Sequence, residues 1–142
     1  MQIAPYLMFN GNAEEAMNFY AQALGGQVLM IQRYGEAPMP TDEATKNQVM
    51  HGGVQIGDTH LMFSDSGGKR EATFGDNVHL SLNLSSEEEI NAVFERMSAG
   101  GNITMPLEDT FWGARFGMLT DKFSVCWMFN WDRPGAKPGQ GE

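Results

Sequence analysis

The sequence predicts an α+β fold in which one βαβββ unit occurs twice. Two helical patterns begin at Ala13 and Glu87, 74 residues apart, and a pair of glycines follows each of them. One short apolar strand precedes each helical pattern, and three strand-like runs come after it. Because the same order of elements recurs at a fixed offset, the chain is expected to be a duplicated module.

The ends of both helices are marked by capping residues. Asn12 is expected to cap the first helix, and Ser86 with Glu89 forms a capping-box pattern at the start of the second. The apolar residues between these caps and the glycine pairs at 25–26 and 100–101 recur at helical spacing. Each helix is therefore expected to bury one face.

Apolar and alternating runs bounded by Gly and Asp turns predict eight strands, at 3–9, 27–34, 50–56, 59–64, 78–84, 102–107, 114–120 and 125–130. Alternation in the fifth strand puts Val78 on the apolar face beneath the helix, together with Leu80, Leu82 and Leu84, and His79, Ser81 and Asn83 on the other face. The loop 35–48 is long enough to act as a lid or to be a mobile connection.

Composition excludes several classes of protein. Eighteen acidic residues against nine basic ones give a net charge of −9, without the cluster of Lys and Arg that a nucleic-acid partner needs. Cys126 is the only cysteine, so no intrachain disulfide is expected, and no window approaches the apolar length of a membrane span. These features predict a cytoplasmic protein, with a flexible tail over 132–142.

Three segments carry a resemblance to a known family, and they are PYLMFNGNAEEAMNFY, HGGVQIGDTHLMFSD and EDTFWGARFGMLTDKFSVCWMFNW. The chain resembles the vicinal oxygen chelate superfamily, which includes glyoxalase I, extradiol dioxygenases and bleomycin resistance proteins, and within it the PhnB-like branch. The resemblance implies one domain over 1–131, with modules at about 1–65 and 77–131 that form a half-open β cup, and a homodimer.

The branch is often labelled as a demethylubiquinone methyltransferase. The chain has no glycine-rich nucleotide loop after its first strand followed by an acidic ribose-binding residue. The resemblance is therefore not taken to imply methyl transfer.

The resemblance also implies where metal ligands would lie, on the first and last strands of each module. Those positions hold Pro5, Met62, His79 and Met128, of which only His79 is a usual ligand for a catalytic divalent metal. The usual metal site is expected to be incomplete, and no cofactor is predicted. A divalent metal bound through His79, with His51 or His60 as further donors, is the alternative.

The expected ligand pocket combines sulfur, aromatic and polar side chains: His79, Ser81, Met62, Ser64, Met128, Asn130, Phe111, Trp112 and Arg115. Six of these residues have a second interpretation: His79 as a hydrogen-bonded histidine, Arg115 as part of a surface ion pair, and Phe111, Trp112, Met62 and Met128 as core packing. Glu108 and Asp109 suit acid/base chemistry or a solvated turn, and Cys126 suits the core.

The leading functional hypothesis is a small-molecule-binding protein without the usual complete metal site. The alternative is a metal-dependent glyoxalase-like lyase or isomerase, or a dioxygenase, with noncanonical ligands around His79. A regulatory or assembly module that uses exposed aromatic residues as an interface is a third hypothesis. Whether any reaction is catalysed stays open at this level.

Overall fold

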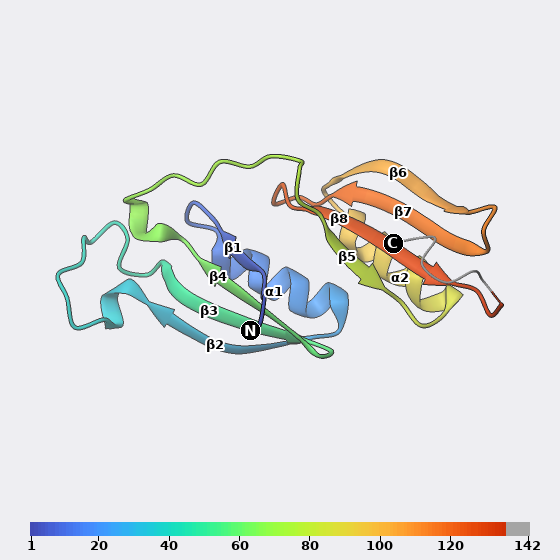
Figure 1. The fold of residues 1–142 in the computed structure, drawn as a ribbon. Coiled ribbons are helices and arrows are strands. Elements are labelled where there is room, and N and C mark those ends of the chain that lie inside the picture. The colour runs from blue at the N-terminus through green and yellow to red at the C-terminus, as the bar shows by residue number, and fades with distance from the viewer. Residues whose placement is uncertain (136–142) are drawn as a thin grey trace. The chain divides into compact units, whose positions relative to one another are not determined.

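The structure is a computed structural model that describes residues 1–135. The chain divides into two compact units, one formed by Met1–Thr73 and the other beginning at Phe74. Each unit consists of a four-stranded sheet and one long helix, drawn as a ribbon in Figure 1. Within residues 1–135, no helix is long and apolar enough to cross a membrane.

Module one begins with a short strand and a helix. Its elements are β1 Tyr6–Met8, α1 Ala13–Leu24, β2 Gln27–Arg33, β3 Val49–Ile56 and β4 Thr59–Ser64, with short 3-10 turns at Tyr34–Glu36 and Ser66–Gly68. The strand order is β1-β4-β3-β2, in which β1 runs parallel to β4 and the other pairs are antiparallel.

Module two repeats this arrangement. Its elements are β5 Leu80–Asn83, α2 Glu87–Ser98, β6 Asn102–Asp109, β7 Ala114–Thr120 and β8 Cys126–Asp132, in the sheet order β5-β8-β7-β6. The parallel pair is again the first and last strand of the module. The predicted α+β fold of two βαβββ modules is therefore confirmed.

Each helix packs its apolar face on one face of its own sheet. In module one Tyr20 lies 5.9 Å from the ring of Phe63, and in module two Phe94 meets Phe129 edge-on at 5.0 Å. A Cβ on Gly52 would lie 2.6 Å from the sulfur of Met17, so glycine is what allows α1 to approach β3. Burying such large side chains stabilises each module by about 1.5–3 kcal/mol per residue.

The helix starts differ from each other. Ser86 caps α2 as predicted, since its hydroxyl accepts from the Glu89 N–H at 3.1 Å. The predicted cap of α1 is wrong, because the Asn12 side chain makes no capping hydrogen bond. The carboxylate of Asp65, which is distant in sequence, accepts instead from the N–H groups of Gly11 and Ala13 at 2.9 and 3.0 Å.

Several strand ends also differ from the prediction. The first strand is shorter than 3–9, because Pro5 lacks the N–H that would continue the ladder towards Ile3. Val78 precedes β5 and is 71% exposed, so its predicted place beneath the helix is wrong.

The C-terminal strand β8 continues to Asp132, and the next residue, Arg133, forms ion pairs with Glu87 and Asp109. These residues fall within the predicted tail of 132–142. Residues 136–142 of that tail lie outside the described part of the chain.

Candidate functional site in module two

The sheet of module two has two faces of different character. Trp127 and Phe129 of β8 alternate with Met128 and Asn130, and the first pair packs towards α2. Phe116 of β7 lies opposite Asn130 in the register and therefore faces away from α2 with it. We call this helix-free side the open face.

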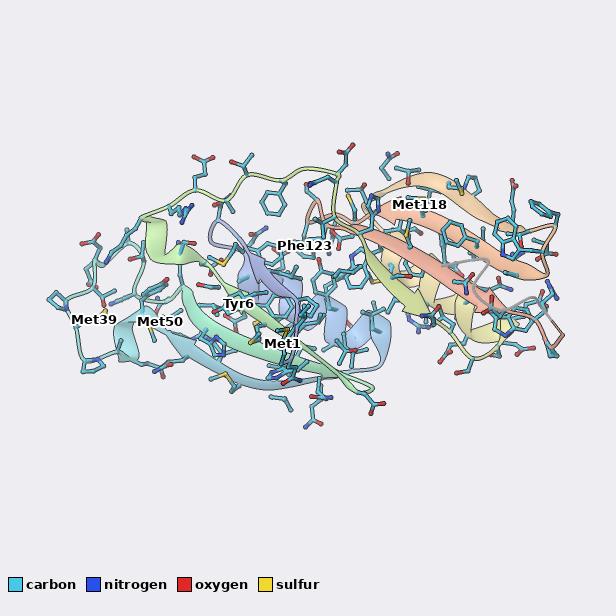
Figure 2. All side chains as sticks on the ribbon, viewed as in Figure 1. Met1, Tyr6, Met39, Met50, Met118 and Phe123 are labelled. Atoms are coloured by element: carbon cyan, nitrogen blue, oxygen red, sulfur yellow. The ribbon has the colours of Figure 1, made fainter. Side chains whose placement is uncertain are left out.

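A pocket of about 500 Å³ lies on the open face, between the sheet and the β6–β7 loop. Most of its lining is aromatic, apolar or sulfur-containing, and the lining residues are Met105, Pro106, Glu108, Asp109, Thr110, Phe111, Trp112, Phe116 and Met128. The volume falls within the roughly 300–1,000 Å³ of small-molecule sites, and an apolar wall with a few polar groups is their usual composition. Figure 2 shows how densely side chains occupy this module.

The loop that carries Phe111 and Trp112 is built by local hydrogen bonds. The Thr110 N–H donates to the Ala114 carbonyl at 2.8 Å, and the Ala114 N–H donates to the Thr110 hydroxyl at 2.9 Å. Gly113 has a φ of 94°, a conformation that suits glycine and closes the turn. The loop therefore holds both aromatic residues at the mouth of the pocket.

Phe111 and Trp112 form an edge-to-face pair whose ring centroids are 4.8 Å apart. Phe111 is 94% exposed, so its position is not explained by packing in a core. The indole Nε1–H of Trp112 is buried and has no hydrogen-bond partner in the protein. Because buried donors are normally paired, an acceptor on a bound molecule would relieve a real energetic deficit.

Asp109 at the edge of the pocket is held by two guanidinium groups. Arg133 Nη2 lies 2.7 Å and Arg115 Nη1 lies 3.1 Å from its Oδ1. The hydrogen bond from Arg133, followed by that from Arg115, holds the pKa of the Asp109 carboxyl below its ordinary value. Asp109 is thereby kept ionised, which suits a structural carboxylate rather than a general acid.

An Arg133→Gln substitution is expected to raise the pKa of Asp109, and more than Arg115→Gln does, because Arg133 makes the larger contribution. The pKa of Asp109 is lower in the folded protein than in the unfolded chain, so its ion pairs stabilise the fold fully at pH values above the unfolded pKa. This stabilisation is lost as the pH falls through the folded pKa. NMR titration of the Asp109 carboxyl measures the effect. If Asp109 has the same pKa in wild type and in Arg133→Gln, the expected role of Arg133 is contradicted.

Five of the nine predicted pocket residues lie in the pocket or on the open face of module two. Phe111, Trp112 and Met128 line the pocket together. Ser81 lies beside Met128 in the register of β5 and β8, at the margin of the same face. The buried side chain of Asn130 donates to Asn83 at 3.4 Å and to Asp132 at 3.2 Å, so it ties β5 and β8 together.

Two of the predicted residues point elsewhere within module two. Arg115 alternates with Phe116 and lies on the helix side, where its Nε donates to the Asn91 side chain of α2 at 2.8 Å. His79 precedes β5, and its Nε2 lies 2.8 Å from the carbonyl oxygen of Asp76. Neither is among the residues that line the pocket.

Met62 and Ser64 belong to module one. By alternation they share the helix-free face of β4, and the Ser64 hydroxyl accepts from the Ser66 N–H at 3.2 Å. On the same sheet the Tyr6 hydroxyl lies 2.9 Å from His51 Nδ1. His60 lies over Gly53, where a Cβ would come 2.5 Å from its Nε2.

Module one also has a smaller polar recess of about 220 Å³ beside Gln48 and Asp65. Both carboxylate oxygens of Asp65 already accept backbone N–H groups, from Gly11, Ala13 and Val49. The recess lies below the roughly 300 Å³ at which ligand sites begin. Its geometry is that of a helix-capping network rather than of a binding site.

The predicted lid, 35–48, is tied back to its own ends. The Gly35 N–H donates to the Lys46 carbonyl at 2.8 Å, and the Tyr34 N–H donates to that of Gln48 at 3.2 Å. The Thr41 hydroxyl donates to the Tyr34 carbonyl at 3.0 Å. A lid role for this segment stays a prediction.

Sequence reasoning missed several residues of the pocket, namely Met105, Pro106, Thr110 and Phe116. Alternation from Met118 back to Phe116 is the signal that predicts Phe116 on the open face of β7. No such signal exists on β6, because register irregularities on both sides of Met105 break the alternation there.

The metal positions implied by the superfamily do not fit a divalent metal. Pro5 has no donor, and Met62 and Met128 offer thioethers, which suit soft metals. His79 Nε2 donates to the backbone carbonyl of Asp76, because a carbonyl oxygen can only accept. The other ring nitrogen of His79, Nδ1, is buried and has no hydrogen-bond partner. Among residues 1–135, no three His, Cys, Asp or Glu side chains are grouped to hold a metal ion.

Comparison with known proteins places the chain in a family. The sequence pattern of the family described as "3-demethylubiquinone-9 3-methyltransferase" matches residues 1–129. Protein PA1353 from Pseudomonas aeruginosa is similar in structure, with a TM-score of 0.85, 40% identity and coverage of 94% of this chain and 98% of that one. A PhnB protein from Bacillus cereus, described as a putative methyltransferase of that kind, has a TM-score of 0.78, 32% identity and coverage of 92% and 99%.

Among relatives in sequence, YjdN of Escherichia coli K12 is 32% identical over 140 residues, which is 92% of this chain and 95% of YjdN. A glyoxalase-related enzyme from Fulvimarina pelagi shares the fold alone, with a TM-score of 0.61, 17% identity and coverage of 93% and 89%.

Two βαβββ modules with this strand order define a class of fold that the chain shares with this glyoxalase-related enzyme. Within that class the chain belongs to the PhnB-like family, described as 3-demethylubiquinone-9 3-methyltransferase. The methyl transfer in that description is a property of the family's label and is not carried over to this chain.

Proposed function

We propose that the protein binds a small molecule in the module-two pocket, and that the ligand is flat, largely apolar and carries a hydrogen-bond acceptor. The proposal is carried by two aromatic residues of the pocket lining: Phe111, which is 94% exposed, and Trp112, whose buried Nε1–H has no hydrogen-bond partner in the protein. A flat ring stacked on these aromatic faces buries surface that the free protein leaves in water. An acceptor on the same ligand satisfies the indole.

The rest of the lining supports a ligand of this kind. Phe116 contributes a third aromatic ring on the sheet side, while Met105 and Met128 are flexible and polarisable enough to fit an irregular outline. The Asp109 carboxylate is paired with Arg115 and Arg133, so it adds little net negative charge to the rim. The proposal does not require a chemical step.

A fluorescence titration with 1-anilinonaphthalene-8-sulfonate tests the pocket directly. Phe111→Ala is expected to weaken binding of this dye by about tenfold, because aromatic pairs contribute about 0.5–1.5 kcal/mol beyond the area they bury. Its stability should stay within about 0.5 kcal/mol of wild type, since Phe111 is exposed.

Phe74→Ala is the matched control, because it removes another exposed phenylalanine of module two that does not line this pocket. It is expected to leave dye binding unchanged. An equal loss of dye affinity in both variants, or no loss of dye affinity in Phe111→Ala, would contradict the proposed site.

The homodimer and the cytoplasmic location belong to the same proposal. Within the two sheets, β1 and β2 and also β5 and β6 are edge strands, and open edges favour association with another chain. Light scattering coupled to gel filtration measures the assembly. A mass of twice 15.7 kDa supports the dimer, and a single-chain mass contradicts it.

A further inference from the structure

Three methionines form a row across the sheet of module two. Met105 of β6 lies opposite Met118 of β7, and Met118 lies opposite Met128 of β8. Side chains directly opposite each other in antiparallel strands share a face, with Cβ atoms about 4.5–5.5 Å apart. Met105 and Met128 line the same pocket, which places the row on the open face.

These methionines are not core residues. The core methionines of the two modules are Met17 and Met97, both 0% exposed beneath the helices. Met105 is 46% exposed, and Met118 and Met128 are half-buried. The three residues are therefore partly accessible to solvent.

The geometry allows the sulfur atoms to converge. Met105 and Met128 are two strands apart, a distance of roughly 9.6 Å at 4.8 Å per strand, and Met118 lies between them. A methionine side chain has three rotatable bonds, so the outer pair can lean towards the middle one.

We propose that Met105, Met118 and Met128 form a thioether site for a soft monovalent cation, Cu(I). Thioether sulfur is a soft, uncharged ligand that selects Cu(I) over zinc, magnesium and other harder ions. Three such donors from three adjacent strands supply a trigonal sulfur site without any carboxylate. This site overlaps the metal positions implied by the superfamily at Met128 alone, and its other two residues, Met105 and Met118, are not among them.

The test uses the full chain under reducing, oxygen-free conditions, with Cu(I) measured by competition against a coloured Cu(I) chelator. Wild type is expected to bind one Cu(I) with this row. Met118→Leu should weaken that binding at least about tenfold, since losing even an outer-shell partner lowers metal affinity by about 10–100-fold. A Met to Leu exchange nearly conserves volume, so the fold is expected to persist, which circular dichroism checks.

Two control variants isolate the row. Met39→Leu removes an exposed methionine in the loop of module one, and Cys126→Ser removes a buried thiol of module two, which is also a soft ligand. Both are expected to keep wild-type affinity. Silver(I) should also shift the ε-methyl NMR signals of Met105, Met118 and Met128 together.

The proposal is overturned if wild type does not compete for Cu(I), if Met118→Leu binds as tightly as wild type, or if Cys126→Ser rather than Met118→Leu loses the ion. Dye binding by Phe111→Ala tests the organic pocket separately. Failure of one proposal is therefore distinguishable from failure of the other.

Discussion

Asp65→Ala is expected to destabilise the protein by about 3–5 kcal/mol, a large share of the roughly 5–15 kcal/mol that holds a domain folded. The Asp65 side chain is almost fully buried, at 2% exposure. Its Oδ1 accepts from Gly11 and Ala13, and its Oδ2 accepts from the Val49 N–H at 2.9 Å. Alanine would leave these donors without their acceptor, at about 1–3 kcal/mol for each one that stays buried.

Urea unfolding followed by circular dichroism measures this loss in module one. Asp42→Ala, in the exposed loop of the same module, is the matched control and should change stability by no more than about 0.5 kcal/mol. A loss below about 1 kcal/mol in Asp65→Ala would show that water replaces the carboxylate at little cost.

Asp121→Ala is expected to produce the second large effect, a loss of about 2–4 kcal/mol in module two. Asp121 is 3% exposed and closes the β7–β8 turn by accepting from the N–H groups of Phe123 and Val125 at 2.8 and 3.1 Å. Its other oxygen accepts from the buried indole Nε1–H of Trp127 at 2.8 Å. The substitution therefore breaks the turn and removes the carboxylate that accepts from the Trp127 indole.

Asp121→Asn separates these two contributions. The amide oxygen can still accept the two backbone N–H groups, but the amide nitrogen cannot accept from Trp127. Asp121→Asn is expected to lose less folding stability than Asp121→Ala. It should also change the near-ultraviolet circular dichroism of Trp127. Asp76→Ala, at an exposed position of the same module, is the control. Equal losses in Asp121→Ala and Asp121→Asn would contradict the division between turn and indole.

Helices and duplicated topology could be predicted from the sequence because they depend on local patterns. The glycine pair after Leu24, the capping box at Ser86 and the spacing of apolar residues are each read within one turn or two. The cap of α1 could not be predicted this way. Asp65 is 52 residues beyond Ala13, and only the parallel pairing of β1 with β4 brings it to the helix start.

The pocket was predicted only in part for a related reason. The resemblance implies a position on the last strand for Met128, and Phe111 and Trp112 are aromatic residues of the expected pocket. The structure brings these three residues together. Arg115 stands between aromatic residues in the sequence, yet alternation sends it to the α2 side. Met105 lies on an irregular strand, so its place in the pocket follows from cross-strand register, which the sequence does not state.

The most direct test of the proposed function is an NMR screen of flat aromatic fragments that carry a hydrogen-bond acceptor, on protein labelled at methionine ε-methyl groups and at nitrogen. Binding in the module-two pocket predicts that active fragments shift the signals of Met105, Met128 and the Trp112 indole N–H, while those of Met39 and Met62 stay in place. Fragments that shift only module-one methionines, or no fragment that shifts the indole, would contradict it.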